Sequence, residues 1–267
     1  MIDMQMSDKK IYFVSDFHLG IAAATSSIER ELKIIRWLDA YADDMAELYL
    51  VGDVFDYWYE YKTVVPKGYT RLFGKLGEIR DRGVPIYFFI GNHDMWMFKY
   101  FEEELDIPIY RAPIIRTFNG KRFFIGHGDG LGPGDYGYKI IKKVFANPIS
   151  QWLFSLIHPS IALRVMKYFS AKSRSYTGEE EPFESPEKEW LVSFSEDYIQ
   201  QDAVDYFVFG HRHLPIDFTL SNGKSTYFNL GEWMFACSYG VFDGERFELR
   251  FFESDYTHIY GNNPKNT

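Results

Sequence analysis

The chain has 267 residues and a single cysteine, Cys237, which excludes a disulfide scaffold and a thiolate metal cluster. Apolar residues make up 46% and charged residues 25%, the usage of an ordinary globular domain, so disorder and coiled coil are excluded. The net charge of −9 makes a general nucleic-acid binder a poor candidate. The first residues lack the basic and apolar segments of a signal peptide, so we expect a cytoplasmic protein.

The first half of the chain alternates short apolar runs with helical patterns, which predicts βαβ units and a sheet covered by helices. Helices are expected at residues 26–41 and 69–82. Strands are expected at residues 11–15, 48–51, 85–90 and 122–125. These elements predict one α/β domain over residues 1–267.

The second half holds several short strand patterns separated by turn residues, and we expect those strands to pair largely antiparallel. The turn dipeptides are Asn222-Gly223 and Asp243-Gly244. The strands are expected at residues 206–209, 216–220, 225–230, 239–242 and 246–252.

Residues 130–189, between the two halves, differ in charge and predict an inserted helical cap subdomain. Within them, residues 136–178 contain no Asp or Glu and leave a net charge of −16 on the rest of the chain. They carry seven basic side chains, Lys139, Lys142, Lys143, Arg164, Lys167, Lys172 and Arg174. Residues 144–163 lack formal charge over the length of a bilayer span, but Pro148 and Pro159 interrupt them, so we expect helices that do not span a membrane.

Five polar motifs are each expected to follow a strand. Because ligands bind at the carboxyl ends of strands in an open α/β sheet, we expect the motifs to converge. They are Asp16-Phe17-His18, Gly52-Asp53, Gly91-Asn92-His93-Asp94, Gly126-His127-Gly128-Asp129 and Gly210-His211-Arg212-His213.

These motifs offer carboxylate, imidazole and carboxamide ligands, a set that suits Mn²⁺, Fe²⁺ or Zn²⁺, with Mg²⁺ or Ni²⁺ as alternatives. The seven candidate ligands are too many for one ion and fit two divalent ions that share Asp53. Any one of the carboxylates can equally be a turn or cap residue, and a lone histidine is usually structural. Five of the seven histidines lie in these motifs, however, which favours a metal site. The candidate ligands are Asp16, His18, Asp53, Asn92, His127, His211 and His213.

In this order the five motifs resemble those of the calcineurin-like metallophosphoesterase superfamily. The resemblance implies a four-layer α/β/β/α sandwich with an inserted helical cap. It also implies a centre that holds two divalent metal ions, and of the metals that suit these ligands we expect Mn²⁺. It implies that His93 acts on the phosphate as electrophile or proton donor, oriented by Asp94. One ion would be held by Asp16, His18, Asp53 and His213, and the other by Asp53, Asn92, His127 and His211.

Within the superfamily the chain is similar to the UDP-2,3-diacylglucosamine pyrophosphatases of lipid A biosynthesis. The similarity includes residues 52–58, Asp135 with Tyr138, and Leu230-Gly231-x-Trp233. It implies hydrolysis of the pyrophosphate of UDP-2,3-diacylglucosamine to UMP and a diacylglucosamine 1-phosphate, with the acyl chains received by the insert. That family carries Arg at the position of His93. The implied substrate contacts are Asn92, Asp135, Ser173 and His211.

Two other functions stay open. A phosphodiesterase or phosphatase for a soluble nucleotide or phosphoester explains the metal centre equally well, but not the basic, aromatic insert. A binding module with a degenerate centre would have lost ligands, and none of the seven is missing. The basic residues 136–178 predict docking on an anionic membrane surface, hence peripheral association with the inner face of the cell membrane.

Overall fold

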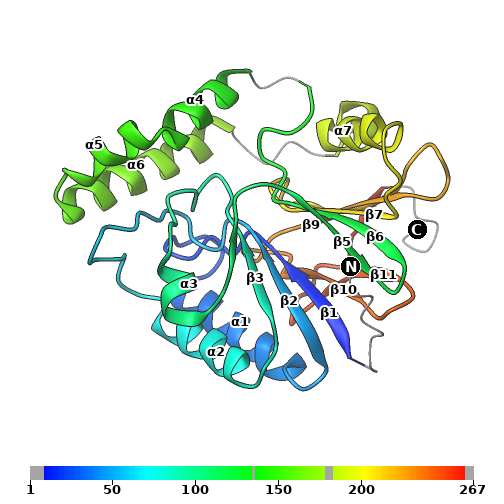
Figure 1. Ribbon diagram of the computed structural model, residues 1–267, viewed down its shortest axis with the longest axis horizontal. Helices are drawn as coiled ribbons and strands as arrows, with labels where there is room; N and C mark the ends of the chain where they lie inside the picture. The colour runs from blue at the N-terminus through cyan, green and yellow to red at the C-terminus, as the bar shows by residue number, and fades with distance from the viewer. Residues whose placement is uncertain (1–8, 134–135, 178–182, 262–267) are drawn as a thin grey trace.

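The computed structural model describes residues 9–133, 136–177 and 183–261, and it contains two six-stranded sheets (Figure 1). The first sheet has the order β11-β10-β1-β2-β3-β4, in which β1 to β4 pair in parallel and β10 pairs antiparallel with both neighbours. Its strands are β1 (Lys10–Val14), β2 (Met45–Val51), β3 (Ile86–Phe89), β4 (Ile109–Tyr110), β10 (Ser238–Phe242) and β11 (Phe247–Phe251).

The second sheet has the order β12-β8-β9-β7-β6-β5. The pairs β5–β6 and β8–β9 are antiparallel, whereas β6–β7, β7–β9 and β8–β12 are parallel. Its strands are β5 (Ile114–Phe118), β6 (Lys121–Ile125), β7 (Tyr206–Phe209), β8 (Pro215–Thr219), β9 (Thr226–Leu230) and β12 (Tyr260–Gly261).

The parallel pairing of β7 corrects the expectation that the second-half strands pair largely antiparallel. In the sheet, β9 lies between β7 and β8. The chain therefore passes from β7 to the more distant strand β8 and then turns at Asn222-Gly223 into β9, which lies between them. The hairpins β8–β9 and β10–β11 are antiparallel as expected. A turn dipeptide therefore identified each hairpin, but it carried no information about the neighbours of β7.

Helices cover the outer faces of both sheets. The first sheet carries α1 (Ser27–Tyr41), α2 (Thr70–Asp81) and the short α3 (Tyr100–Leu105), and the second carries α7 (Trp190–Ile199) (Figure 1). Helix α1 begins as its sequence predicts, because Ser26 and Glu29 form a capping box that satisfies free backbone N–H groups.

Three apolar clusters join these layers. The cluster between the sheets packs residues of β1 and β2, such as Phe13 and Val51, against residues of β6 and β7, such as Phe123 and Val208. A second cluster lies between the first sheet and α1 and α2, around Trp37 and Leu76, and a third lies under α7, around Leu191. The predicted four-layer α/β/β/α sandwich is thereby confirmed.

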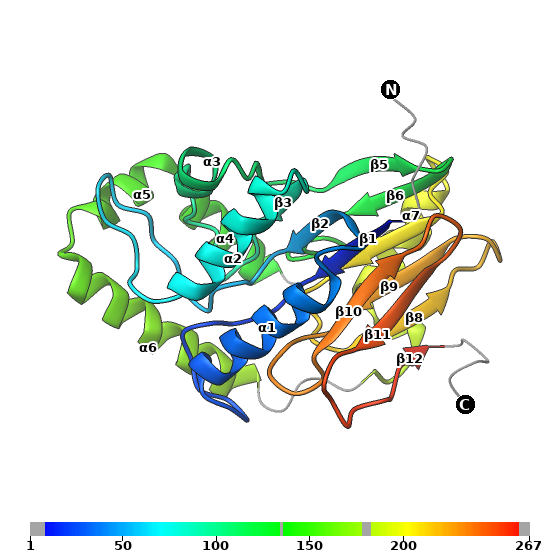
Figure 2. The same cartoon turned by 90° about the horizontal axis from the view of Figure 1, so that it is seen from below.

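Residues 136–177 form three consecutive helices grouped at one end of the molecule (Figure 2). They are α4 (Tyr136–Ala146), α5 (Pro148–Ser155) and α6 (Pro159–Thr177). Prolines begin α5 and α6, so the uncharged stretch of residues 144–163 is divided between three helices. Among the residues that the structure describes, no helix is both long and apolar enough to cross a membrane.

Aromatic side chains of the loops after β2 and β3 hold the insert helices against the sandwich. The Tyr59 hydroxyl donates to the carbonyl of Gln151 at 2.6 Å, and the Trp96 indole N–H donates to that of Phe145 at 2.7 Å. The ring of Phe154 packs against both, with its centroid 4.8 Å from that of Tyr59 and 4.5 Å from that of Trp96. Helices α4 and α5 are thus attached to the loops that follow two of the predicted site strands.

Candidate metal centre

The five polar motifs directly follow β1, β2, β3, β6 and β7, as predicted. Three come from the first sheet and two from the second, so both sheets contribute to one site. Five of the predicted ligands have a left-handed backbone with positive φ, a conformation that non-glycine residues seldom adopt and that turns the chain sharply at the strand end. These residues are Asp16 (φ 55°), His18 (44°), Asp53 (52°), His211 (70°) and His213 (55°).

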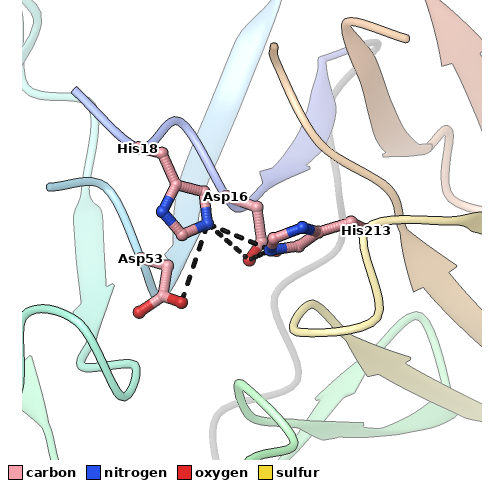
Figure 3. Close-up of side chains that lie close together, drawn as sticks. All are labelled: Asp16, His18, Asp53 and His213. Atoms are coloured by element: carbon pink, nitrogen blue, oxygen red, sulfur yellow. Dashed lines mark hydrogen bonds and ion pairs between the residues drawn. The ribbon is translucent and has the colours of Figure 1, made fainter. Parts of the chain in front are cut away.

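The first group of ligand atoms comes from β1, β2 and β7 and is drawn in Figure 3. Nε2 of His213 lies 3.2 Å from Oδ1 of Asp16, and Nε2 of His18 lies 3.6 Å from the same oxygen. Nε2 of His18 is also 3.8 Å from Oδ2 of Asp53. These atoms all lie within 4.8 Å of one another, which is compatible with a single metal ion.

Two observations test whether this group fits a cation. Oδ1 of Asp16 is buried and accepts no hydrogen bond among the described residues, although a buried carboxylate oxygen is costly to leave unsatisfied. The Nε2 atoms of His18 and His213 face each other at 3.0 Å, so at most one of them carries a proton and the other presents a lone pair to the site. A cation between them would satisfy all three atoms, so the residues present fit a metal ion.

The second group shares Asp53 and adds ligands from β3, β6 and β7. Nε2 of His127 lies 3.3 Å from Oδ2 of Asp53 and 3.3 Å from Oδ1 of Asn92. His211 joins Asp53 and His127 within 4.8 Å. Nδ1 of His127 contacts the carbonyl of Val51 at 2.9 Å, a contact that directs Nε2 towards the group. All seven predicted ligands therefore lie together, and Asp53 is common to both groups.

Glycines in the motifs permit this close approach. A Cβ at Gly91 would overlap the carboxylate of Asp53, and a Cβ at Gly210 would overlap that of Asp16. Neither glycine has a positive φ, so here the small size of the residue matters and not its conformational freedom.

Electrostatic interactions in the centre favour positive charge. Burial opposes the charged form of His127, but the charge and hydrogen bond of Asp53, together with the charges of Asp16 and Asp129, outweigh it and raise the pKa of His127 to about 10. Burial and the nearby His127 together lower the pKa of His211 to about 4. The carboxylates thus stabilise one cationic group where a divalent ion would replace the proton.

The loop after β2 supplies a residue that the sequence did not single out, Asp56. Its Oδ1 lies 3.3 Å from Nδ1 of His18, and its carbonyl oxygen lies 2.9 Å from Nδ1 of His93. Burial opposes ionisation of Asp56, but the hydrogen bonds and charges of its neighbours, His18 first among them, together lower its pKa to about 2. Its position in the sequence, three residues after the predicted ligand Asp53, could have indicated this role, because a carboxylate that close to a ligand can hold other ligands in place.

Asp94 has a different position from the one expected. Its carboxylate accepts hydrogen bonds from the backbone N–H groups of Gly91 at 2.7 Å and Val54 at 2.9 Å. Burial and the charge of Asp53 raise the pKa of Asp94 to about 7. The prediction that Asp94 orients His93 is therefore wrong: Asp94 joins the loops after β2 and β3, and the backbone of Asp56 holds the His93 ring.

Two predicted substrate contacts cannot be placed against the centre. Asp135 lies outside the described residues. Ser173 lies on α6, in a part of the helix whose side chains the structure does not describe. Asn92 and His211, the other two, are members of the second ligand group.

Comparison with known proteins agrees with this geometry. Residues 9–215 match the family model described as calcineurin-like phosphoesterase. A protein of Porphyromonas gingivalis named UDP-2,3-diacylglucosamine hydrolase is 35% identical over an alignment of 262 residues, and the match covers 91% of this chain and 98% of that one. A protein of the same name from Yersinia pseudotuberculosis is 29% identical, over 76% of this chain and 81% of that one. Among solved structures, an archaeal phosphodiesterase is similar at a TM-score of 0.45 and 15% identity, over 91% of this chain and 99% of that one.

The family match covers most of the sandwich, from β1 to the first residue of β8, and includes all five motifs. Members of this family are hydrolases that use divalent metal ions, and the described His and Asp groups are suited to bind them. The chain therefore belongs to the calcineurin-like phosphoesterase family.

Proposed function

We propose that this protein hydrolyses the pyrophosphate of UDP-2,3-diacylglucosamine to UMP and a diacylglucosamine 1-phosphate. The observation that carries the proposal is the convergence of seven ligand side chains from five strand ends beside a helical insert rich in exposed apolar groups. The relative named for this substrate matches over nearly its whole length, which supports the same substrate class here.

In this proposal Asp16, His18, Asp53 and His213 hold one divalent ion, and Asp53, Asn92, His127 and His211 hold the other. We propose Mn²⁺ as the native metal, since the oxygen and imidazole donor set suits it; Fe²⁺, Zn²⁺, Mg²⁺ and Ni²⁺ are the alternatives. When bound, such a pair polarises the phosphoryl oxygens and acidifies water at the reacting phosphorus. Asn92 and His211, together with Asp135 and Ser173, are proposed to contact the substrate.

His93 acts on the phosphoryl group without binding metal in this scheme. Its Nδ1–H donates to the carbonyl of Asp56, and its backbone N–H donates to Oδ1 of Asp53 at 2.8 Å. The ring is thereby fixed beside His18, with its centroid 4.9 Å from that of His18. A proton on Nε2 would make it a donor to an oxygen of the phosphoryl group, where negative charge develops.

We further propose that the insert, residues 130–189, is a cap that meets the substrate at an anionic membrane surface, at the inner face of the cell membrane. Much of its apolar material is not buried: Ile149, Trp152 and Leu156 are 67%, 60% and 66% exposed. Among the described side chains of the insert, the other exposed large apolar ones are Ile140, Ile141, Val144, Phe145, Leu153, Ile157, Ile161, Val165, Tyr168 and Phe169. Apolar area of this extent on a charged protein is typical of a surface that meets lipid or another protein.

The basic residues of the insert helices whose side chains the structure describes divide into two sets. The Nζ groups of Lys139 and Lys142 donate to the carbonyls of Gly132 and Asp129, so part of their hydrogen-bonding capacity is already used within the protein. Lys143, Arg164 and Lys167 are exposed among the apolar groups and are the ones we expect to attract anionic lipid.

Turnover of three compounds with added Mn²⁺ tests the substrate: UDP-2,3-diacylglucosamine, a UDP-sugar without acyl chains, and a simple soluble phosphodiester. We expect the acylated compound to be hydrolysed with the highest kcat/KM, because only it engages the insert. Equal or better turnover of either soluble compound would replace the proposal with a soluble-substrate phosphoesterase.

Vesicle co-sedimentation tests the membrane surface. Binding should require anionic lipid, weaken as salt rises, and fall when Lys143, Arg164 and Lys167 are changed to Gln. The matched control changes three lysines outside the insert to Gln, the exposed Lys9 and Lys224 and the half-exposed Lys121, and should bind as the wild type does. Equal sedimentation with neutral and anionic vesicles, or none with either, would contradict docking by this surface.

A further inference from the structure

Asp56 contacts three parts of the site: the ligand His18, the ring of His93 and helix α6 of the insert. One carboxylate oxygen, Oδ1, faces Nδ1 of His18 at 3.3 Å, and the backbone carbonyl holds Nδ1 of His93 at 2.9 Å. Because Nδ1 of His18 is engaged in this way, its Nε2 is left to face Asp16, Asp53 and His213. The orientation of Asp56 therefore sets the orientation of a predicted ligand.

The second carboxylate oxygen of Asp56 is reached from the insert. The hydroxyl of Ser170 on α6 donates to Oδ2 of Asp56 at 2.5 Å, across 114 residues of sequence. Asp56 is 1% exposed and Ser170 is 8% exposed, so water competes little for this hydrogen bond. It is a direct polar link from a helix of the insert to a group that supports the metal centre.

The neighbours of Ser170 show which side of α6 faces the sandwich. Tyr168 and Phe169 are 62% and 61% exposed, so this part of α6 presents large apolar groups outwards and one small hydroxyl inwards. A serine in a helix interior commonly bonds to a carbonyl of its own preceding turn, whereas this one donates to a carboxylate of the sandwich.

We propose that Ser170 is a positioning residue through which α6 fixes Asp56 and, through Asp56, the ring of His18 in the geometry that binds metal. Displacement of α6 would remove the donor from Oδ2 and release Asp56 to reorient away from His18. The insert would then set metal affinity as well as contact substrate. This inference deepens the proposed function and rests on it only in assuming that His18 is a metal ligand.

Titration of Mn²⁺ into the metal-free full chain, with no substrate present, tests the inference. We expect Ser170→Ala to raise the apparent Kd for Mn²⁺ about 10-fold, the usual effect of removing a group that orients a ligand. Ser170→Thr keeps the hydroxyl and should stay close to the wild type. Ser160→Ala removes an exposed hydroxyl from the same helix and should leave the Kd unchanged.

The double variant Ser170→Ala with Asp56→Asn separates positioning from a general structural role. If Ser170 acts through Asp56, the double variant should bind Mn²⁺ about as weakly as Asp56→Asn alone, because the two changes interrupt one path. Long-range NMR of the histidine ring nitrogens in the metal-free protein should also show His18 shifted by Ser170→Ala.

Three results would overturn the inference: a Kd for Ser170→Ala equal to that of Ser160→Ala, fully additive losses in the double variant, or a lower unfolding temperature with unchanged Mn²⁺ affinity. Failure of the proposed function looks different. In that case the wild type and variants would follow the expected Mn²⁺ order, but the acylated substrate would not be turned over.

Discussion

Nε of Arg212 donates to both carboxylate oxygens of Glu189, at 3.1 and 2.9 Å, and both side chains are buried. The guanidinium carbon also lies 4.8 Å from the centroid of the Trp190 ring. Arg212 stands between the predicted ligands His211 and His213, whereas Glu189 lies directly before α7. This buried pair therefore ties the start of α7 to a loop of the metal centre.

Removing the charge of Glu189 should cost stability. Glu189→Gln leaves a buried guanidinium without its counter-charge, and we expect the free energy of unfolding to fall by about 3 kcal/mol in urea denaturation. Glu184→Gln is the control, because Glu184 pairs with Lys188 on the surface and exposed pairs contribute about 0–1 kcal/mol. Similar losses in the two variants would show that the buried pair has no special contribution.

Asp53 is expected to be the shared ligand of both ions. Asp53→Ala removes the carboxylate oxygen that lies 3.8 Å from Nε2 of His18 and 3.3 Å from Nε2 of His127, so both groups lose a member. Metal analysis should find the protein depleted of both ions, and turnover should be abolished. Asp43→Ala, at a fully exposed carboxylate, should retain metal and activity. A variant at Asp53 with two ions per chain and wild-type activity would refute the assignment.

His93 is expected to affect chemistry without affecting metal content. The neighbouring Asn92 supplies the ligand atom at this strand end, whereas Nδ1 of His93 is engaged by the carbonyl of Asp56. His93→Ala should lower kcat by roughly 10²–10⁴, the range for a positioned acid or base, with metal content unchanged. Metal analysis beside steady-state kinetics decides the point, since loss of metal together with activity would make His93 a ligand.

Glu47 should make stability depend on pH. Burial raises the pKa of Glu47 above its ordinary value of 4.5, although Tyr49 donates a hydrogen bond to it at 2.7 Å. The folded protein therefore prefers the protonated carboxyl. That preference stabilises the fold fully below the unfolded-state pKa and is lost as pH rises through the folded-state pKa.

Glu47→Gln carries no charge at any pH and should raise the unfolding temperature at pH 7.5 by about 2–4 °C, which corresponds to about 1 kcal/mol. The gain should disappear below pH 4.5, where the wild-type carboxyl is also protonated. Glu103→Gln, at an exposed position on α3, should show neither effect. A gain that is the same at pH 4 and pH 7.5 would exclude the titration of Glu47 as its cause.

The sequence predicted the strands that carry the site better than the edges of the sheets. Strands β1, β2, β3, β6 and β7 have apolar runs that end in a polar motif, and both signals are local. Strands β4 and β12 have two residues each, too short for a period to be visible, and they exist because a neighbouring strand pairs with them.

The sequence predicts the metal ligands better than the residues that hold those ligands in place. Asp56 and Asp94 are both carboxylates near ligands, but their roles depend on which groups the folded loops bring within reach. The same holds for Ser170 and Glu189, which contact the site across 114 and 23 residues of sequence. Ligand types can be inferred from residue chemistry, whereas such partners follow only from the packing of loops and helices.

The left-handed backbone of five predicted ligands has a consequence for how stability and activity are related in this protein. A non-glycine residue in that conformation costs on the order of 1 kcal/mol, and packing between the sheets must offset this cost. Glycine at Asp16, His18, Asp53, His211 or His213 would relieve the backbone but delete a ligand, so the chain keeps a strained backbone at these positions for the side chains that it presents. At these five positions the geometry of the ligands is therefore maintained against the preference of the backbone, and part of the packing energy of the two sheets is spent on presenting the metal centre.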